Sequence, residues 1–532
     1  MGFYLPRKIR TFHPEVPAEG DTPCDEPALP AATSRPPRRP QPPVPVIHDE
    51  ALGIPFARFP NLPPEVWNHL VGAMRDGVQA ICSAIDVACG TGLETDLATL
   101  LDQVIPKTVY ALGRDVMESI LSHERGFLGS RLTCDKCNGT LEFEGNKPRS
   151  FLTRLGEIAI RRAYYHCKCG HSVFPLDTLL GLEDHDALPA IQEEIAFLAA
   201  DLSYAKAEAT AKRLLPITIS NETVQRVTAT VADQIQAEQE ADRKAAFGDP
   251  AHANFPEPAA IPSNPAALVA VDGAMCRIRN QEEYREFKVG VLGTLDPSKA
   301  TVDQPAPVEA KHYVAHFADA DKIFEYIAVE YHRQGLDRCP ILHLLGDGAE
   351  WIWARGKALC SEHQQYIPTL DYFHAAEHIS DLGKTLFGTE TPATQEWCKT
   401  MRDLLDEGKV EDFLAALELQ QQQAVERADP ERAEAARGEL EYFRERRDLL
   451  NYKLCRQLGL PIGSGIVEGG IRFVGKDRLH RTGMRWNVEG AEAILQLRAT
   501  DASGERATFS QRKAATILQE YHTQKTLWLQ AA

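Results

Sequence analysis

Several features that would define common protein classes are missing from this 532-residue chain. No apolar run approaches the roughly 20 residues that span a bilayer, so we expect no membrane insertion. The first ten residues hold no apolar stretch, so no secretory signal is expected, and Pro6 stands where a myristoylation signal has Ser or Thr. Bases are outnumbered, with 58 Lys and Arg against 76 Asp and Glu, and the net charge of −18 excludes an evenly basic nucleic-acid coat. Local basic patches remain open.

Cysteine is sparse, with 12 residues, and without a secretory signal it indicates a reducing compartment with metal-bound or buried thiols. We therefore expect a cytoplasmic protein. Hydrophobic residues make up 43% of the chain and charged residues 25%, which favours a folded core over wholesale disorder.

Proline and periodicity divide the chain into predicted segments. Residues 1–60 are expected to be a disordered proline-rich tail, with polyproline II character around Ser34–Val46. After it we predict a helical segment over 61–128, a zinc ribbon over 129–180, a helical region over 186–247, a first core part over 267–374, a helical insertion over 375–455, a last core part over 456–500 and a C-terminal helical tail over 501–532.

The helical region over 186–247 has the outline of a helix-turn-helix. Pro216 ends one predicted helix and Ser220 can cap the next, which carries Gln225 and Arg226 outward. Any helical hairpin shows this outline, so DNA reading and a plain helical layer both stay open.

The region after residue 266 changes to alternating strands and helices. Three strands, a helix, a strand, a helix and a strand are expected between Ala267 and Asp371. This order predicts an α/β fold with a ribonuclease-H-like core. The acidic block over 375–450, with 18 acids against 10 bases, is expected to be helical and inserted before the last core element.

Four cysteines in two close pairs predict a structural zinc site. Cys134 and Cys137 precede Cys167 and Cys169, and four thiolates suit tetrahedral Zn²⁺. Because the second pair is Cys-x-Cys, His166 or His171 could replace one thiolate. The alternative is four unligated cytosolic thiols.

The predicted ribbon is locally basic, with eight bases against four acids over residues 131–170. This excess makes Arg161 and Arg162 candidate contacts to the DNA backbone.

Two predicted strands end in aspartate. Asp272 follows the apolar run Leu268–Val271, and Asp347 follows Leu342–Gly346. If the two strands are parallel neighbours, their carboxylates meet at one edge, where divalent cations relieve the repulsion. Each aspartate alone is equally an ordinary turn residue.

A third acid, Glu468, lies in the first turn of a helix that Ser464 is expected to cap. The chain after it carries five formal positive charges against one acid, which suits a phosphodiester substrate; these candidate DNA-binding residues are Arg472, Lys476, Arg478, Arg481 and Arg485. Three carboxylates around two Mg²⁺ (or Mn²⁺) ions predict phosphoryl transfer without a covalent enzyme intermediate.

The order of these motifs resembles the bacterial ISKra-type insertion-sequence transposases of the DDE superfamily. The similar segments are Val271–Gly273, Gly346–Trp353, Asp371–His374, Gly463–Glu468, Gly483–Trp486 and the Tyr164–Gly170 cysteine segment. The resemblance implies cleavage and joining of DNA at transposon ends by Asp272, Asp347 and Glu468. It also implies a nucleoid-associated protein that acts as a homo-oligomer, because two ends must be joined.

Further residues near these motifs are candidate supports of the active site. Asp371 and His374 match an Asp-x-x-His signature of related Mutator-like enzymes, and Glu350 lies one helical turn past Asp347. Trp351 and Trp353 either stack on a base or, as we favour, pack under the sheet. Two other functions stay open: a DNA-binding regulator or domesticated transposase that does not cut, and a structure-selective nuclease.

Overall fold

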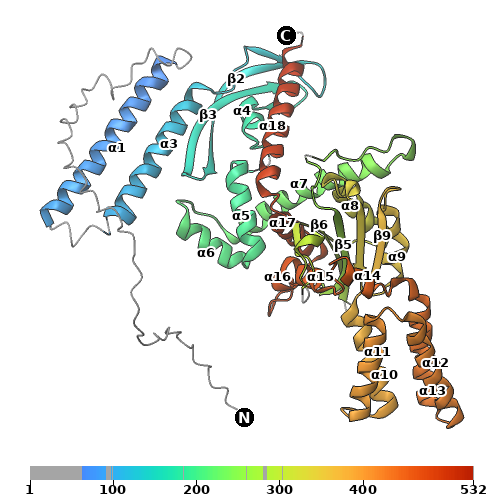
Figure 1. Ribbon diagram of the computed structural model, residues 1–532. Helices are drawn as coiled ribbons and strands as arrows, with labels where there is room; N and C mark the ends of the chain where they lie inside the picture. Colours follow the sequence, from blue (N-terminus) through green and yellow to red (C-terminus); the bar gives the residue numbers. More distant parts are fainter. Residues whose placement is uncertain are drawn as a thin grey trace, which may run out of the picture. The chain divides into compact units, whose positions relative to one another are not determined.

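A computed structural model describes residues 63–91, 98, 100–183, 185–258, 260–279, 284–301 and 304–530. The proline-rich segment over 1–60 and its expected polyproline II conformation lie outside these residues. The described part of the chain has a mixed α/β fold with two separate sheets (Figure 1). The predicted α/β class is therefore confirmed.

The described chain begins with helices, of which α3 packs on the first sheet and α1 packs on α3. Their bounds are α1 Pro64–Thr91, the π-helix η2 Leu100–Val104 and α3 Ile105–His123. The side chain of Leu155 approaches Gly113 of α3 so closely that an added Cβ would lie 2.5 Å from its Cδ1 atom. The predicted helical character of this segment is thus present.

The first sheet has four antiparallel strands in the order β1-β2-β3-β4: β1 Arg131–Thr133, β2 Thr140–Thr153, β3 Gly156–Cys167 and β4 Ser172–Val173. Strand β3 alternates inward and outward residues, and Ile158, Ile160 and Tyr165 are buried. The C-terminal helix α18, Arg506–Leu529, packs against this sheet and buries Tyr521 and Trp528 in its core.

Four helices follow the first sheet: α4 Pro175–Leu180, α5 Pro189–Asp201, α6 Tyr204–Leu214 and α7 Asn221–Phe247. Ser220 caps α7, as predicted, by accepting a hydrogen bond from the Thr223 amide at 3.2 Å. Gln225 and Arg226 are exposed, as expected, on the outer side of α7. The inner sides of α5, α6 and α7 share a core with Leu497 of a later helix.

The second sheet has five strands in the order β7-β6-β5-β8-β9: β5 Ala266–Arg277, β6 Tyr284–Leu295, β7 Val308–His316, β8 Ile341–Gly346 and β9 Gln365–Leu370. Strand β6 is antiparallel to β5 and β7, whereas β8 is parallel to β5 and β9. The strands lie near their predicted positions, because long buried runs such as Leu268–Val271 are local signals. The prediction that the first of them ends at Asp272 is wrong, because β5 keeps its pairing with β6 as far as Arg277.

Helices cover both faces of this sheet. On one face lie α8 Ala320–Arg333 and α9 Glu350–Gly356, and on the other lie α15 Gly465–Gly470, the π-helix η8 Ile471–Lys476, α16 Asp477–Leu479 and α17 Val488–Ala502. Short 3₁₀ turns connect elements of the chain: η3 Pro250–His252, η4 Pro297–Lys299, η5 Leu336–Arg338, η6 Lys357–Leu359 and η7 Arg447–Leu449.

The acidic block after β9 is helical, as expected. It consists of α10 Tyr372–Phe387, α11 Pro392–Asp406, α12 Val410–Glu426 and α13 Pro430–Glu445, followed by the short α14 Tyr452–Gln457 (Figure 1). These helices bury their own core around Phe413, Phe443 and Tyr452, and Leu370 of β9 joins it.

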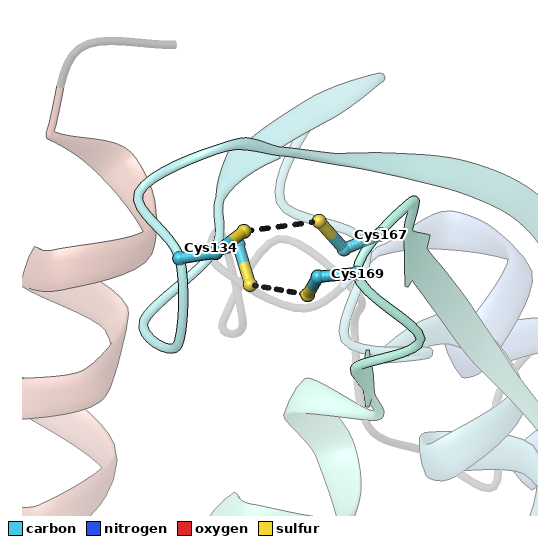
Figure 2. Close-up of side chains that lie close together, drawn as sticks. Cys134, Cys167 and Cys169 are labelled. Carbon is cyan, nitrogen blue, oxygen red and sulfur yellow. Dashed lines mark hydrogen bonds between the residues drawn. The ribbon is translucent and has the colours of Figure 1, made fainter.

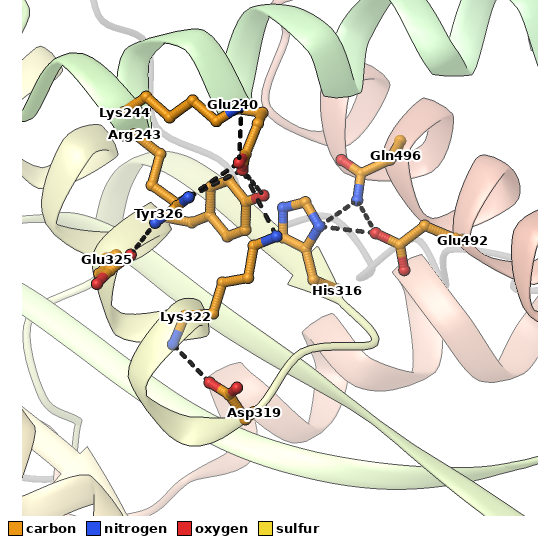
Figure 3. Close-up of polar contacts among 10 residues, drawn as sticks. All are labelled: Glu240, Arg243, Lys244, His316, Asp319, Lys322, Glu325, Tyr326, Glu492 and Gln496. Carbon is orange, nitrogen blue, oxygen red and sulfur yellow. Dashed lines mark hydrogen bonds and ion pairs between the residues drawn. The ribbon is translucent and has the colours of Figure 1, made fainter. Parts of the chain in front are cut away.

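Polar contacts tie α7 to the second sheet and its helices (Figure 3). Glu240 of α7 accepts hydrogen bonds from Arg243 and from the hydroxyl of Tyr326 on α8, each at 2.8 Å. His316 at the end of β7 stacks on Tyr326 and contacts Glu492 of α17 at 2.7 Å through Nδ1. The ion pairs of Arg243 with Glu325 and of Glu240 with Lys322 also join α7 to α8.

None of the helices within the described residues combines the length and apolarity that a bilayer crossing requires.

Candidate functional site

The register of the second sheet brings two of the predicted acids together. Val271 of β5 pairs with Gly346 of β8 in parallel register, so Asp272 and Asp347 come directly after paired residues on neighbouring strands. Each aspartate accepts a hydrogen bond from a nearby backbone amide, Asp272 from Gly273 at 2.6 Å and Asp347 from Ala349 at 3.1 Å. Both carboxylates are partly exposed at the carboxyl edge of the sheet.

A third aspartate lies at the same edge. Gly346 also pairs with Leu370 of β9, so Asp371 occupies the next equivalent position. Its amide donates to the Gly346 carbonyl at 2.7 Å, and its side chain caps α10 by accepting from the Phe373 amide at 3.0 Å. In contrast to Asp272 and Asp347, Asp371 is only 4% exposed.

Glu468 reaches this edge from α15. Its side chain is exposed, and its Oε1 atom lies 3.0 Å from the hydroxyl of Ser464. The expectation that Ser464 caps α15 through its side chain is wrong, because its hydroxyl donates to Asp371 at 2.5 Å instead. The helix begins without a side-chain cap, which leaves Ser464 between two carboxylates.

Electrostatics link the three predicted acids. Burial is the main cause that raises the pKa of Asp272 to about 6, and the charges of Asp347 and Glu468 raise it further. The Gly273 amide and the Lys476 ammonium act in the opposite direction. The charges of both Asp347 and Glu468 therefore reach the carboxylate of Asp272.

The acids are nevertheless more widely spaced than the ligands of one small coordination sphere. In the described parts of the chain, the four cysteines form the only group with three or more potential ligand atoms mutually within 4.8 Å. Two Mg²⁺ ions about 3.5–4 Å apart, each about 2.1 Å from its oxygens, accommodate ligand atoms up to about 8 Å from one another. A two-cation site thus needs no tighter cluster, and the oxygen donors suit Mg²⁺ or Mn²⁺.

Four of the five basic residues predicted after Glu468 face solvent. Arg472 is 78% exposed at its side chain, and the exposed set is completed by Lys476, Arg481 and Arg485. Lys476 is also the cation that lowers the pKa of Asp272, so the basic surface begins beside the carboxylates.

Arg478 is the exception, and its predicted DNA contact does not fit the structure. It is fully buried, its guanidinium stacks 4.8 Å from the Trp486 ring and donates to the Ala199 carbonyl at 3.3 Å. Its role is to fix the basic segment to α5. Residues 471–476 form a π-helix, whose longer turn rotates the following residues relative to an α-helix and carries Arg478 inward.

The same correction applies in the first sheet. Arg161 is exposed, but Arg162 is only 7% exposed and donates to Asp177 at 2.7 Å. Successive residues of a strand point to opposite faces, so Arg162 shares the buried face of Ile158 and Ile160. Arg162 holds α4 on the sheet and does not face a ligand.

The other candidate residues divide between the acid edge and the packing around it. Glu350 is exposed in the first turn of α9. His374 Nε2 lies 3.3 Å from His378 Nε2, and His378 contacts Glu439 at 2.9 Å. Trp351 and Trp353 pack with the buried core under the sheet, as we favoured.

Sequence reasoning missed a connection between the inserted helices and the turn after Asp347. His378 stacks on Tyr442 with ring centroids 4.1 Å apart, and the Arg446 guanidinium lies 4.0 Å from the centroid of the same tyrosine ring. Arg446 Nε donates to the Gly348 carbonyl at 3.0 Å. Gly348 has a positive φ of 95°, and an added Cβ would lie 2.6 Å from the Tyr442 hydroxyl. The only feature of the sequence that indicated a turn here was the pair Asp347–Gly348, and nothing in the sequence indicated its contact with the inserted helices.

The four predicted zinc ligands lie together in the first sheet (Figure 2). The Sγ atoms of Cys134 and Cys169 are 3.7 Å apart, and those of Cys137 and Cys167 are 3.5 Å apart. Four thiolates about 2.3 Å from one Zn²⁺ would be about 3.8 Å from each other, so the spacing fits a tetrahedral ion.

The two histidines that were alternative ligands have other partners. His166 Nδ1 lies 2.9 Å from the hydroxyl of Ser172, and His171 Nε2 lies 2.9 Å from Asp135. The four sulfur atoms therefore cluster without either histidine among them.

Comparison with known proteins points to an uncharacterised family. Residues 94–251 match the family described as "Uncharacterised protein family (UPF0236)". The chain is similar to the "UPF0236 protein in vanSb 3'region" of Streptococcus gallolyticus, with 23% identity over 370 residues that cover 68% of this chain and 74% of the relative.

These matches overturn the resemblance to ISKra-type transposases. The matching family is a distinct one, and the matched residues 94–251 precede all three acids. The motifs behind the resemblance are short, and cysteine pairs and strand-end aspartates recur wherever zinc or cation chemistry needs them. Their order was therefore insufficient to identify a family.

Proposed function

We propose that the chain catalyses cation-dependent phosphodiester cleavage and strand transfer on DNA ends, with Asp272, Asp347 and Glu468 as the cation ligands. The observation that carries this proposal is the parallel register of β5 and β8, which places Asp272 and Asp347 directly after paired residues on neighbouring strands, with the charge of Glu468 reaching Asp272. Acids from two parallel strands and a later helix repel one another there, and such an arrangement is stabilised by divalent cations.

The topology of the second sheet supports a ribonuclease-H-like core. Three antiparallel strands are followed by two parallel ones, in the order β7-β6-β5-β8-β9, with helices on both faces. The helices α10–α13 are inserted between β9 and α15, which carries Glu468. Asp272 and Asp347 come directly after Val271 and Gly346, the last residues that β5 and β8 pair in parallel, and ligands of open α/β sheets bind at this end of parallel strands.

The chain's own residues would bind and orient the DNA backbone at this edge. Bound Mg²⁺ or Mn²⁺ would activate a water or a 3′-hydroxyl and neutralise the leaving oxygen. Lys476 beside Asp272 would hold a phosphate near the carboxylates, and the exposed Arg472, Arg481 and Arg485 would extend the contact along the strand.

The cysteine cluster is proposed to be a structural zinc site that makes the first sheet a zinc ribbon. Its four sulfur atoms have the spacing of a tetrahedral zinc site, and the exposed Arg161 on β3 is available for a phosphate. Gln225 and Arg226 on α7 are proposed as further DNA contacts of a helix-turn-helix-like unit. Joining two DNA ends would require a homo-oligomer.

The proposal is tested with labelled DNA taken from both sides of the chain's own gene, incubated with Mg²⁺ or Mn²⁺. We expect site-specific cleavage and joining of the new 3′ ends to a target plasmid. Asp272→Asn, Asp347→Asn and Glu468→Gln should each abolish cleavage while DNA binding persists. The matched control is Glu362→Gln, an exposed acid before β9 at the opposite end of that strand, which should leave cleavage unchanged.

Other results would select a different function. Cleavage of branched DNA without end preference or joining would indicate a structure-selective nuclease, and binding without cleavage would indicate a regulator. Cleavage retained by any of the three acid variants would refute the assignment of that residue.

A further inference from the structure

Asp371 is buried beside the proposed cation site but has no place among its ligands. Its Oδ1 atom accepts from the Phe373 amide at 3.0 Å, and its Oδ2 atom accepts from the Ser464 hydroxyl at 2.5 Å. Asp371 is 4% exposed and Ser464 is 5% exposed, so water does not compete for either contact. Each oxygen of Asp371 therefore already accepts one hydrogen bond from the protein.

The segment that carries Ser464 is held firmly against the start of α10. The Tyr372 amide donates to the Ile462 carbonyl at 2.9 Å. An added Cβ at Gly463 would lie 2.6 Å from the Phe373 ring, so the two segments approach closely here. The backbone that leads to Ser464 is thus held beside α10 by a contact that does not involve the Ser464 hydroxyl.

The hydroxyl of Ser464 faces two carboxylates with one proton. It lies 2.5 Å from Asp371 Oδ2 and 3.0 Å from Glu468 Oε1, and a hydroxyl donates one hydrogen bond at a time. The shorter contact with the buried carboxylate receives the proton, because charge-assisted O–H···O⁻ bonds have lengths of about 2.5–2.7 Å. The Oε1 atom of Glu468 then faces a lone pair of the Ser464 oxygen, so this contact does not stabilise the position of Glu468.

We infer that Asp371 is a positioning residue that keeps the Ser464 proton away from Glu468, so that Glu468 remains available to a divalent cation. The inference rests on the proposed function, because it concerns the cation site of Asp272, Asp347 and Glu468. If the hydroxyl donated to Glu468, it would occupy one acceptor site of Oε1 and lower the basicity of the carboxylate, so that Glu468 would bind a cation more weakly.

The substitution Asp371→Asn separates this role from helix capping. Asparagine caps helices as well as aspartate does, so its oxygen keeps the Phe373 amide and its NH₂ group takes the place of Oδ2. That NH₂ group donates to Ser464 and turns the hydroxyl proton toward Glu468. The cap survives while the hydrogen bond changes direction.

The experiment is a Mn²⁺ titration of the full chain, followed by calorimetry and by the electron paramagnetic resonance signal of free Mn²⁺, without DNA. We expect Asp371→Asn to weaken Mn²⁺ binding about two- to tenfold, because the hydrogen bond that Glu468 then accepts competes with the cation for its electron density. Ser464→Ala should bind as tightly as the wild type or more tightly. The double variant Asp371→Asn/Ser464→Ala should return to the affinity of Ser464→Ala.

The matched control is Asp319→Asn, the same substitution at the exposed cap of α8, where Asp319 accepts from the Lys322 amide at 2.8 Å. It should not change Mn²⁺ binding.

Three outcomes would overturn the inference. Unchanged binding in Asp371→Asn would remove the role of Asp371, and a double variant as weak as Asp371→Asn would assign the loss to a disturbed α10. Loss of binding in Ser464→Ala comparable to Glu468→Gln would make Ser464 a support of Glu468. The proposed function fails separately, and the inference with it, if the wild type and Glu468→Gln do not differ in Mn²⁺ binding.

Discussion

Replacing Asp272 by an asparagine should stabilise the protein in the absence of divalent cations. Burial of the carboxylate, together with the charges of Asp347 and Glu468, raises its pKa from 3.8 to about 6. At about 1.4 kcal/mol per tenfold change in proton affinity, this pKa shift lowers the free energy of unfolding at neutral pH by at most about 3 kcal/mol. Because the side chain keeps some solvent contact, we expect about 1–2 kcal/mol.

The sign follows from proton linkage. Between about pH 4 and pH 6 the folded protein holds a proton on Asp272 that the unfolded chain has released, so the free energy of unfolding falls as pH rises through this window. Above about pH 6 both the folded and the unfolded chain have released this proton, so the free energy of unfolding does not fall further through Asp272. The amide of the Asp272→Asn variant carries no charge at any of these pH values. The variant and the wild type should therefore have similar stabilities near pH 4 and differ most near pH 7.5.

The measurement is thermal unfolding of both proteins in EDTA across this pH range. At pH 7.5 the variant should melt a few degrees higher. Added Mn²⁺ should raise the melting temperature of the wild type and not that of the variant, since ligand binding stabilises only the protein that binds. The matched control is Asp296→Asn, because the Ser298 hydroxyl and amide hold the pKa of Asp296 below its usual range, and this variant should not gain stability. A variant of Asp272 that is equally or less stable at pH 7.5 would refute the reasoning.

Three further predictions concern the zinc site, the buried arginine and the basic surface. Elemental analysis should find about one zinc per chain, and the double variant Cys134→Ser/Cys167→Ser should lose both the zinc and the fold of the first sheet. The control Cys276→Ser should keep the zinc. Zinc retained by the double variant would contradict the site. Arg478→Met should lower the free energy of unfolding by about 2–4 kcal/mol in chemical denaturation, because a fully buried side chain with stacking and hydrogen-bonding partners is removed. Unchanged stability would refute the role of Arg478 in fixing the basic segment to α5. Arg472→Ala and Arg485→Ala should each reduce the slope of log binding constant against log salt concentration by about one unit in DNA binding. Arg478→Met should leave this slope unchanged, because Arg478 is buried. Equal effects from all three variants would contradict the assignment of exposed and buried residues.

The strands and the acids that follow their buried runs could be predicted because their signals are local. The run Leu268–Val271 marks the buried part of β5, but Asp272 does not end the strand, which continues beside β6 to Arg277. The parallel pairing of β5 with β8 was a hypothesis, and its register is confirmed at Val271 and Gly346. The cysteine pairs were equally clear, because two short turns suffice to bring four sulfur atoms together.

Residue orientation was harder to predict. Arg161 and Arg162 were taken together as basic residues, although strand periodicity places them on opposite faces and the buried Ile158 and Ile160 assign Arg162 to the inner one. That signal was in the sequence. Arg478 gave no comparable signal, because its position depends on the π-helix over residues 471–476, and a π-helix cannot be distinguished from an α-helix by residue spacing.

The contact between Asp371 and Ser464 shows why a site can remain partly hidden in its sequence. Ser464 stands one residue before a short helix, where serine ordinarily caps, and that local rule fails because a buried carboxylate 93 positions earlier in the chain competes for the hydroxyl. The competition is decided by burial: at 4% exposure Asp371 has no water to accept from, whereas a helix start at the sheet edge can use solvent. Long-range competition for one proton therefore sets the surroundings of Glu468, and only the folded arrangement reveals it.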